Sequence, residues 1–137
     1  MYKLIFIATI LFINHTAGIS QRYDFIWMNG YDGGKGDYRF GTSMMDFSEG
    51  NPVASFMPEG KLNIFYCNAS IADKNGRLMY YTNGYDVMDA QHKLVKGATD
   101  LGIRYWDGLK AHQGALFLPD LVDESKYHLL YVDLNYS

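Results

Sequence analysis

The chain has little cysteine: Cys67 is the only one among 137 residues, so no disulfide can form within the chain. A lone cysteine inside a strand pattern is more often a small buried hydrophobe than a reactive thiol, and we expect Cys67 to be buried. No cluster of histidines and cysteines with metal-ligand spacing compensates for the missing disulfides. The stability of the fold must therefore come from packing alone.

Runs of basic residues and long apolar stretches are also missing after residue 20. The formal net charge is −3, and Lys and Arg do not cluster, so neither a nucleic-acid-binding nor an anionic-membrane-binding surface has support. No later apolar stretch is long enough to span a bilayer. The amphipathic period of a helix is absent from the same region. These absences favour an exported, strand-rich protein.

The first twenty residues have a different composition from the rest. A short cationic start that contains Lys3 precedes the apolar run 4–13, and small and polar residues follow up to Ser20. Ten apolar residues span about 15 Å as a helix, roughly half of the hydrocarbon core, so a membrane anchor is disfavoured. We predict a signal peptide at 1–20, cleaved after Ser20 or Gly18. The mature domain, 21–137, would then be secreted or displayed at the cell surface.

Aromatic residues and glycine are abundant, and their distribution predicts an all-β fold. Phe, Trp and Tyr make up 16% of the chain, and 14 glycines separate the aromatic segments. The clearest signal is a hairpin at 66–83, with its turn at Asp73-Lys74-Asn75-Gly76. Its arms, within 62–72 and 77–83, are apolar on both faces, which predicts that other sheets cover both faces.

Further strands are expected on either side of this hairpin, separated by glycine-rich or polar loops. They lie at 23–29, 37–47, 53–57, 113–118 and 127–134, with a tighter hairpin whose arms are 86–88 and 92–94. Residues 30–36 and 96–110 are interpreted as loops. The hairpin at 66–83 has a similar unit about 50 residues later, and periods of 40 to 50 residues are typical of β-propeller blades.

Five short motifs also carry a resemblance to a known family. They are Trp27-Met28-Asn29-Gly30-Tyr31, Met45-Asp46-Phe47-Ser48, Asn68-Ala69-Ser70-Ile71, Tyr81-Thr82-Asn83-Gly84 and Gln113-Gly114-Ala115-Leu116. In this order they resemble the N-terminal segment of large secreted β-propeller-like proteins of Bacteroidota, which usually end in a type IX secretion sorting domain. The resemblance covers about 22–133 and implies a fold and a cell-surface location, without any established activity.

The resemblance and the length together predict an incomplete propeller. About 117 mature residues provide two or three blades, whereas a propeller needs at least four. Open blades leave unpaired strand edges and an uncovered apolar face, so we expect a fragment or truncated product that expresses poorly alone. Its partners would include the missing C-terminal blades of the parent chain.

None of the histidines or acidic residues forms a recognisable metal motif. The four histidines, His15, His92, His112 and His128, lack the HxH and HExxH spacings of zinc sites. Asp32 and Asp37 flank a glycine-rich loop but lack the remaining ligands of a calcium loop, and the hairpin turn explains Asp73, Asn75 and Gly76. We therefore predict no metal site and no cofactor.

Catalytic motifs are equally sparse. Ser70 and Ser125 lie outside any Gly-x-Ser-x-Gly setting, and Trp106-Asp107 has the dipeptide of WD repeats without the accompanying Gly-His. Tyr105 and Trp106 either stack on a sugar or peptide or, as we prefer, fill a core between sheets. A glycosidase-type pair of carboxylates remains an alternative, because such a pair is recognised by the distance between its two carboxyl groups in the folded protein.

The sequence predicts no catalytic, cofactor-binding or metal-binding residues. We interpret the chain as a non-catalytic, exported β-propeller segment that serves as a recognition or scaffold module of a larger protein. Its ligand would be a protein or a glycan, with no nucleic acid and no membrane involved after signal cleavage. The alternative is part of an extracellular carbohydrate-active propeller hydrolase whose acids lie partly in further blades.

Overall fold

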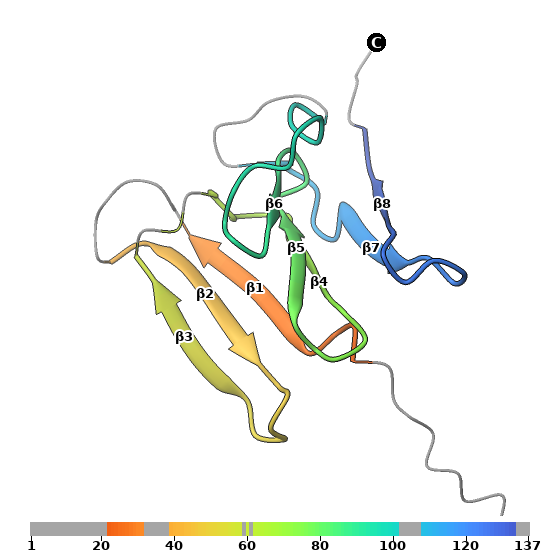
Figure 1. The fold of residues 1–137 in the computed structure, drawn as a ribbon. Helices are drawn as coiled ribbons and strands as arrows, with labels where there is room; N and C mark the ends of the chain where they lie inside the picture. Colours follow the sequence, from red (N-terminus) through yellow and green to blue (C-terminus); the bar gives the residue numbers. More distant parts are fainter. Residues whose placement is uncertain (1–21, 32–38, 59, 61, 102–107, 134–137) are drawn as a thin grey trace, which may run out of the picture.

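The computed structural model describes residues 22–31, 39–58, 60, 62–101 and 108–133. Within these ranges the chain contains β-strands and turns but no helix, so the predicted all-β class is confirmed (Figure 1). In the same ranges, accordingly, no helix has the length and apolar character to cross a membrane. The predicted signal peptide at 1–20, and the candidates Asp32, Asp37, Tyr105 and Trp106-Asp107, lie outside the described residues.

The strands form three small antiparallel sheets, each a meander in chain order. The first sheet comprises β1 (Ile26–Tyr31), β2 (Gly41–Asp46) and β3 (Val53–Met57). The middle sheet comprises β4 (Ala69–Ala72), β5 (Leu78–Thr82) and β6 (Val87–Asp89). The third sheet comprises β7 (Ala115–Pro119) and β8 (Tyr127–Tyr131). In Figure 1 the middle sheet lies between the other two.

Apolar side chains cover both faces of the middle sheet. The cluster that it shares with the first sheet comprises Ile26, Met28, Leu62, Ile64, Ala72, Tyr81 and Met88. The cluster on its other face comprises Ile71, Val87 and Phe117, with Tyr80, Tyr127 and Leu129 packed around them. Neighbouring positions of the central hairpin thus alternate between two cores. This confirms that sheets cover the hairpin on both faces.

The predicted turn of the central hairpin is confirmed in detail. The Oδ1 atom of Asp73 accepts hydrogen bonds from the backbone N–H groups of Asn75, at 2.8 Å, and Arg77, at 2.9 Å. Gly76 has φ = 85°, a left-handed conformation that favours glycine, and its N–H donates to the carbonyl of Asp73. The carboxylate and the glycine together reverse the chain.

The leading arm of that hairpin is shorter than expected. Residues 62–68 form no strand, and β4 begins only at Ala69. Leu62 and Ile64 are instead buried in the first cluster, while the Nδ2 atom of Asn83 donates to the backbone carbonyl of Asn63 at 3.0 Å. Packing of two side chains and a bond from a side-chain amide replace the strand pairing that the composition suggested. The segment connects two sheets.

The returning arm departs from strict alternation. A strict period of two places Leu78 on the same face as Tyr80, but the register shifts between Ile71 and Ala72. As a result Leu78 packs against the first cluster, whereas Tyr80 faces the opposite core together with Met79. A bulge depends on how two strands pair, and no local pattern in either strand predicts it.

The tighter hairpin predicted at 86–94 is present only in part. β6 pairs with β5, and its return is a single bridge between Met88 and Leu94. The turn repeats the geometry of the central hairpin, because Asp89 Oδ1 accepts the N–H groups of Gln91 and Lys93, both at 2.9 Å.

The first strands of the three sheets lie next to one another. β1 contacts β4, and β4 contacts β7, while the later strands of each meander extend away from these contacts (Figure 1). The three strands begin at Ile26, Ala69 and Ala115, spaced 43 and then 46 residues apart. The chain therefore repeats one arrangement at a nearly constant interval.

Candidate binding groove

A groove of about 400 Å³ lies between the middle sheet and the third sheet. Its walls come from β5 and β6, the segment after β6, the two strands β7 and β8, and the turn that joins them. The lining residues are Tyr80, Val87, Val95, Ala98, Phe117, Ser125, Lys126, Tyr127, His128 and Leu129. Most of these side chains are apolar or aromatic, which is typical of ligand pockets.

Three aromatic rings form the wall of the groove. Tyr80 stacks with Phe117 at a centroid separation of 6.4 Å and meets Tyr127 edge-on at 5.5 Å. These separations are typical of favourable aromatic pairs. Burial raises the pKa of Tyr127, with smaller contributions from nearby acidic groups. The three rings give this wall an aromatic surface suited to an apolar side chain.

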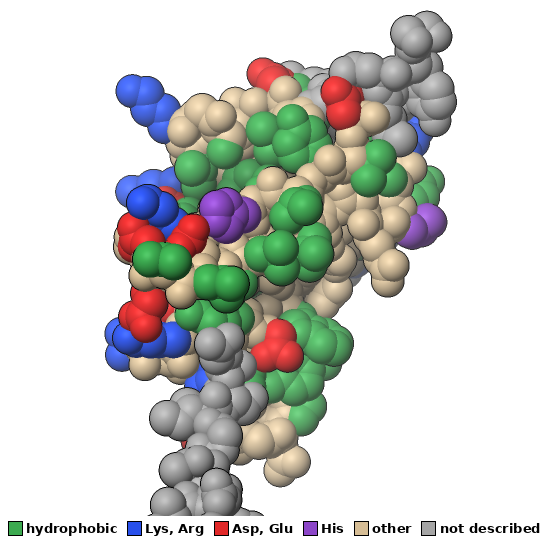
Figure 2. All heavy atoms as spheres, turned by 90° about the vertical axis from the view of Figure 1, so that its right-hand side faces the viewer, with side chains coloured by type: hydrophobic (Ala, Val, Ile, Leu, Met, Phe, Trp, Pro, Cys, Tyr) green, Lys and Arg blue, Asp and Glu red, His purple; other side chains and the backbone are tan. Residues whose placement is uncertain are grey.

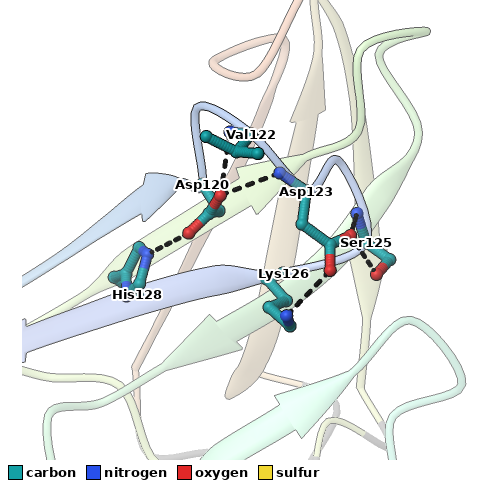
Figure 3. A network of polar contacts seen from close by, with 6 residues as sticks. All are labelled: Asp120, Val122, Asp123, Ser125, Lys126 and His128. Carbon is teal, nitrogen blue, oxygen red and sulfur yellow. Dashed lines mark hydrogen bonds and ion pairs between the residues drawn. The ribbon is translucent and has the colours of Figure 1, made fainter.

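A polar network holds the turn between β7 and β8 at the rim (Figure 3). The Oδ1 atom of Asp120 accepts the N–H groups of Asp123, at 2.8 Å, and Val122, at 2.9 Å. Its Oδ2 atom lies 2.9 Å from Nε2 of His128. The two backbone N–H donors, followed by His128, lower the pKa of Asp120 to about 2. Asp120 is thus ionised across the physiological range.

The other charged groups at the rim are paired with one another. Lys126 Nζ lies 2.9 Å from Asp123, and Lys74 of the central hairpin pairs with Glu124. Ser125 donates its hydroxyl to Asp123 at 2.6 Å. The rim therefore carries three acids, Asp120, Asp123 and Glu124, against the two lysines, so one negative charge remains in excess.

A second cavity, of about 270 Å³, lies where β1, β4 and β7 meet. Asn68 Nδ2 donates to the carbonyl of Met28 at 3.2 Å and to Asn29 Oδ1 at 2.7 Å. Ser70 Oγ donates to the carbonyl of Ile26 at 2.8 Å and accepts the N–H of Met28 at 3.2 Å. These side chains join two sheets, and Ser70 has a structural partner in place of a catalytic base.

The described histidines lie in separate environments. His92 Nδ1 lies 3.0 Å from the hydroxyl of Tyr81, His112 packs against the ring of Tyr66, and His128 contacts Asp120. Burial, with a smaller contribution from Asp89, raises the pKa of Tyr81 to about 12. Within the described ranges no three His, Cys, Asp or Glu side chains are grouped as metal ligands.

Cys67 is buried, as predicted, and burial raises the pKa of its thiol. The groove itself was missed by the sequence interpretation, because Ala98 lies in the stretch 96–110 assigned to loop, and Val95 lies between that loop and the predicted arm 92–94. Their apolar character was the only local signal, and it does not reveal which strand they face. Ser125 and Lys126 lie in the turn between β7 and β8.

No protein family, curated protein or solved structure matches the chain. The resemblance to secreted β-propeller-like proteins therefore stays a prediction. What the groove does must follow from its own geometry.

Proposed function

We propose that the chain is a β-propeller segment of an exported protein and acts as a non-catalytic recognition or scaffold module. The observation that supports this most is the side-by-side placement of β1, β4 and β7, the first strands of three successive meanders. In a propeller, the first strands of successive blades lie around a common axis. Each sheet would then correspond to one blade.

Two further features fit this arrangement. The spacings of 43 and 46 residues between first strands fall within the range of four-stranded blades. The middle sheet buries both faces against its neighbours, as an internal blade does. The bridge at Leu94 would be the remnant of a fourth strand in that blade.

The third sheet presents an apolar outer face. Leu116 and Leu130, which are cross-strand partners, are 54% and 52% exposed, and Leu118 is also exposed. Figure 2, which views the molecule from the side of β7 and β8, shows apolar side chains across this face, a cluster of charged side chains along its left edge and a few acidic ones elsewhere. An open array of blades would leave such a face for the next blade.

Export and family membership are parts of the same proposal. They rest on the composition of residues 1–20 and on the five motifs of the N-terminal resemblance. N-terminal sequencing of the protein recovered from the medium of an expressing bacterium tests the first part. Cleavage after Ser20 or Gly18 is expected, and a retained Met1 contradicts it.

The recognition role is tested by incubating the full chain with a glycan array and, in parallel, with the same glycans in solution. We expect retention on a subset of ligands without any release of reducing ends. Turnover that scales with protein concentration would instead support the carbohydrate-active hydrolase. If the glycans are neither retained nor turned over, the glycan form of the proposal is rejected. Protein ligands would then be tested next.

A further inference from the structure

We propose that the open edge of β8 accepts an added antiparallel strand from another polypeptide, whose apolar side chains enter the groove. This names a class of partner for the recognition role and rests on that role. The partner is an extended segment with a net positive charge. Three observations support the inference: the hydrogen-bonding state of β8, the incomplete third sheet, and the position of the groove beside that edge.

The hydrogen-bonding pattern shows which backbone groups face outward. The N–H of Asp120 donates to the carbonyl of Lys126, and the N–H of Val132 donates to the carbonyl of Gly114, so both pairs are of the hydrogen-bonded type. Because such pairs alternate along an antiparallel ladder, Tyr127, Leu129 and Tyr131 belong to the other type. Their N–H and C=O groups point away from β7, and no described strand pairs with them.

In the described part of the chain, the third sheet has two strands, whereas each of the two sheets before it has three. β3 pairs with β2, and β6 pairs with β5, whereas the corresponding edge of β8 has no described strand. An added strand would give the third sheet the three-stranded form of its neighbours. Pairing with a row of unused donors and acceptors is the basis of β-strand addition.

The groove lies beside this edge and supplies the pocket for side chains. Tyr127 and Leu129 line it from β8, while Val87, Val95 and Ala98 line it from the middle sheet. A residue directly opposite Leu129 on an added strand would place its side chain on the same face, and so in the groove. A volume of about 400 Å³ accommodates a phenylalanine side chain with smaller apolar neighbours.

The negative charge at the rim favours a partner strand with a net positive charge. The rim carries three acids, Asp120, Asp123 and Glu124, against two lysines, Lys126 and Lys74, so one negative charge remains in excess. Lysines at the ends of an added strand would meet this acidic excess, whereas glutamates would be repelled. The site therefore fits a strand that has alternating apolar residues and basic ends.

The probe is the fluorescein-labelled peptide Lys-Val-Thr-Phe-Thr-Val-Lys, titrated with the full chain and followed by fluorescence anisotropy. Its valines and phenylalanine fall on one face of the strand and its lysines and threonines on the other. We expect saturable binding. N-methylation of the peptide nitrogens that face β8 should weaken binding at least about tenfold, because it removes backbone hydrogen bonds and keeps every side chain.

Two protein variants separate the edge from the groove. Tyr131→Pro removes an outward N–H that the β7–β8 ladder does not use, and Ala98→Leu fills part of the groove. Both should weaken binding, whereas Leu130→Thr, a substitution on the exposed opposite face of β8, should not. Circular dichroism checks that each variant folds, and the N-methylated peptide provides the same test with the unchanged protein.

Absence of binding, or binding that N-methylation does not affect, would overturn strand addition. Equal binding of a peptide with glutamate ends would overturn the assigned charge. Self-association of the chain that Tyr131→Pro abolishes would make a second copy the occupant and overturn the assigned partner. Glycan turnover would reject the recognition role without changing peptide binding, so the two failures can be told apart.

Discussion

Single aspartates organise the turns of this protein. Asp73, Asp89 and Asp120 each accept two backbone N–H bonds from residues that follow within four positions. Burial acts to raise the pKa of Asp73, but the N–H groups of Arg77 and Asn75 outweigh it and hold that pKa below its ordinary value. One short side chain thus satisfies donors that a strand would otherwise have to pair.

The lowered pKa of Asp120 predicts how the stability of the turn between β7 and β8 depends on pH. Its pKa is lowered to about 2, so its contribution to the stability of the turn is fully present above the unfolded value of about 4. That contribution is lost as the pH falls from about 4 toward 2. Amide-exchange protection of Val122 and Asp123, corrected for intrinsic rates, should fall over this window. In Asp120→Asn, which keeps an acceptor without the charge, this pH dependence should vanish, and its persistence would contradict the assignment.

Hydrogen bonds from side chains join strands of different sheets, in addition to the backbone hydrogen bonds within each sheet. The outward edge of β1 is occupied by Asn68 and Ser70, which bond the N–H of Met28 and the carbonyls of Met28 and Ile26. An edge strand in the interior of the assembly would otherwise carry unsatisfied polar groups. Two polar side chains, Ser70 within β4 and Asn68 directly before it, therefore take the place of backbone pairing between β1 and a neighbouring strand.

Ser70→Ala tests this role at the scale of elements. It removes the acceptor for the N–H of Met28 and the donor to the carbonyl of Ile26, so local opening of β1 should become easier by about 1–3 kcal/mol. Hydrogen exchange of the Met28 amide measures this as a loss of protection. The matched control is Ser125→Ala, whose hydroxyl bonds an exposed turn. Unchanged protection of Met28 in Ser70→Ala would refute the role.

At the scale of the whole molecule, the third sheet exposes apolar surface. Beyond its outer face, Leu121 and Val122 at the tip of its turn are 95% and 94% exposed. Monomeric proteins rarely leave large contiguous apolar patches in water, so such a face is normally covered. The middle sheet, by contrast, is buried on both faces.

The chain on its own should therefore behave as a poorly cooperative, association-prone protein. Residues 21–137 in isolation should show a broad thermal transition and should scatter light as concentration rises. Leu130→Lys, on the exposed outer face, should reduce the scattering without sharpening the transition. Calorimetry and light scattering measure the two effects. A sharp, reversible two-state melt of the unchanged segment would contradict the open-array interpretation.

The local chemistry of turns and strands was predictable from the sequence. The Asp73 turn and the strand at Val53–Met57 both follow from short-range patterns. Pro119 was expected to stop a strand, and it is the last residue of β7. Its position opposite Tyr127 requires no N–H in the ladder, which is why proline is tolerated there.

The contacts between sheets were not predictable. The bulge at Ile71 and Ala72, the irregular course of 62–68 and the groove beside β8 all depend on which sheet lies opposite. Propensity acts over a few residues, whereas these features arise from side chains 20 to 45 residues apart, as with the bond of Ser70 to Ile26. A strand that is apolar on both faces signals that it is covered, but not by what.

The sequence by itself determined an antiparallel all-β chain, because alternating aromatic and aliphatic residues interrupted by Asp- and Gly-led turns leave the backbone few other solutions. Only the tertiary structure decided that three meanders lie with their first strands together, that one sheet is enclosed, and that the edge of β8 borders a groove. Burial of apolar surface is non-directional, so which surfaces meet is settled by the packing of the whole chain.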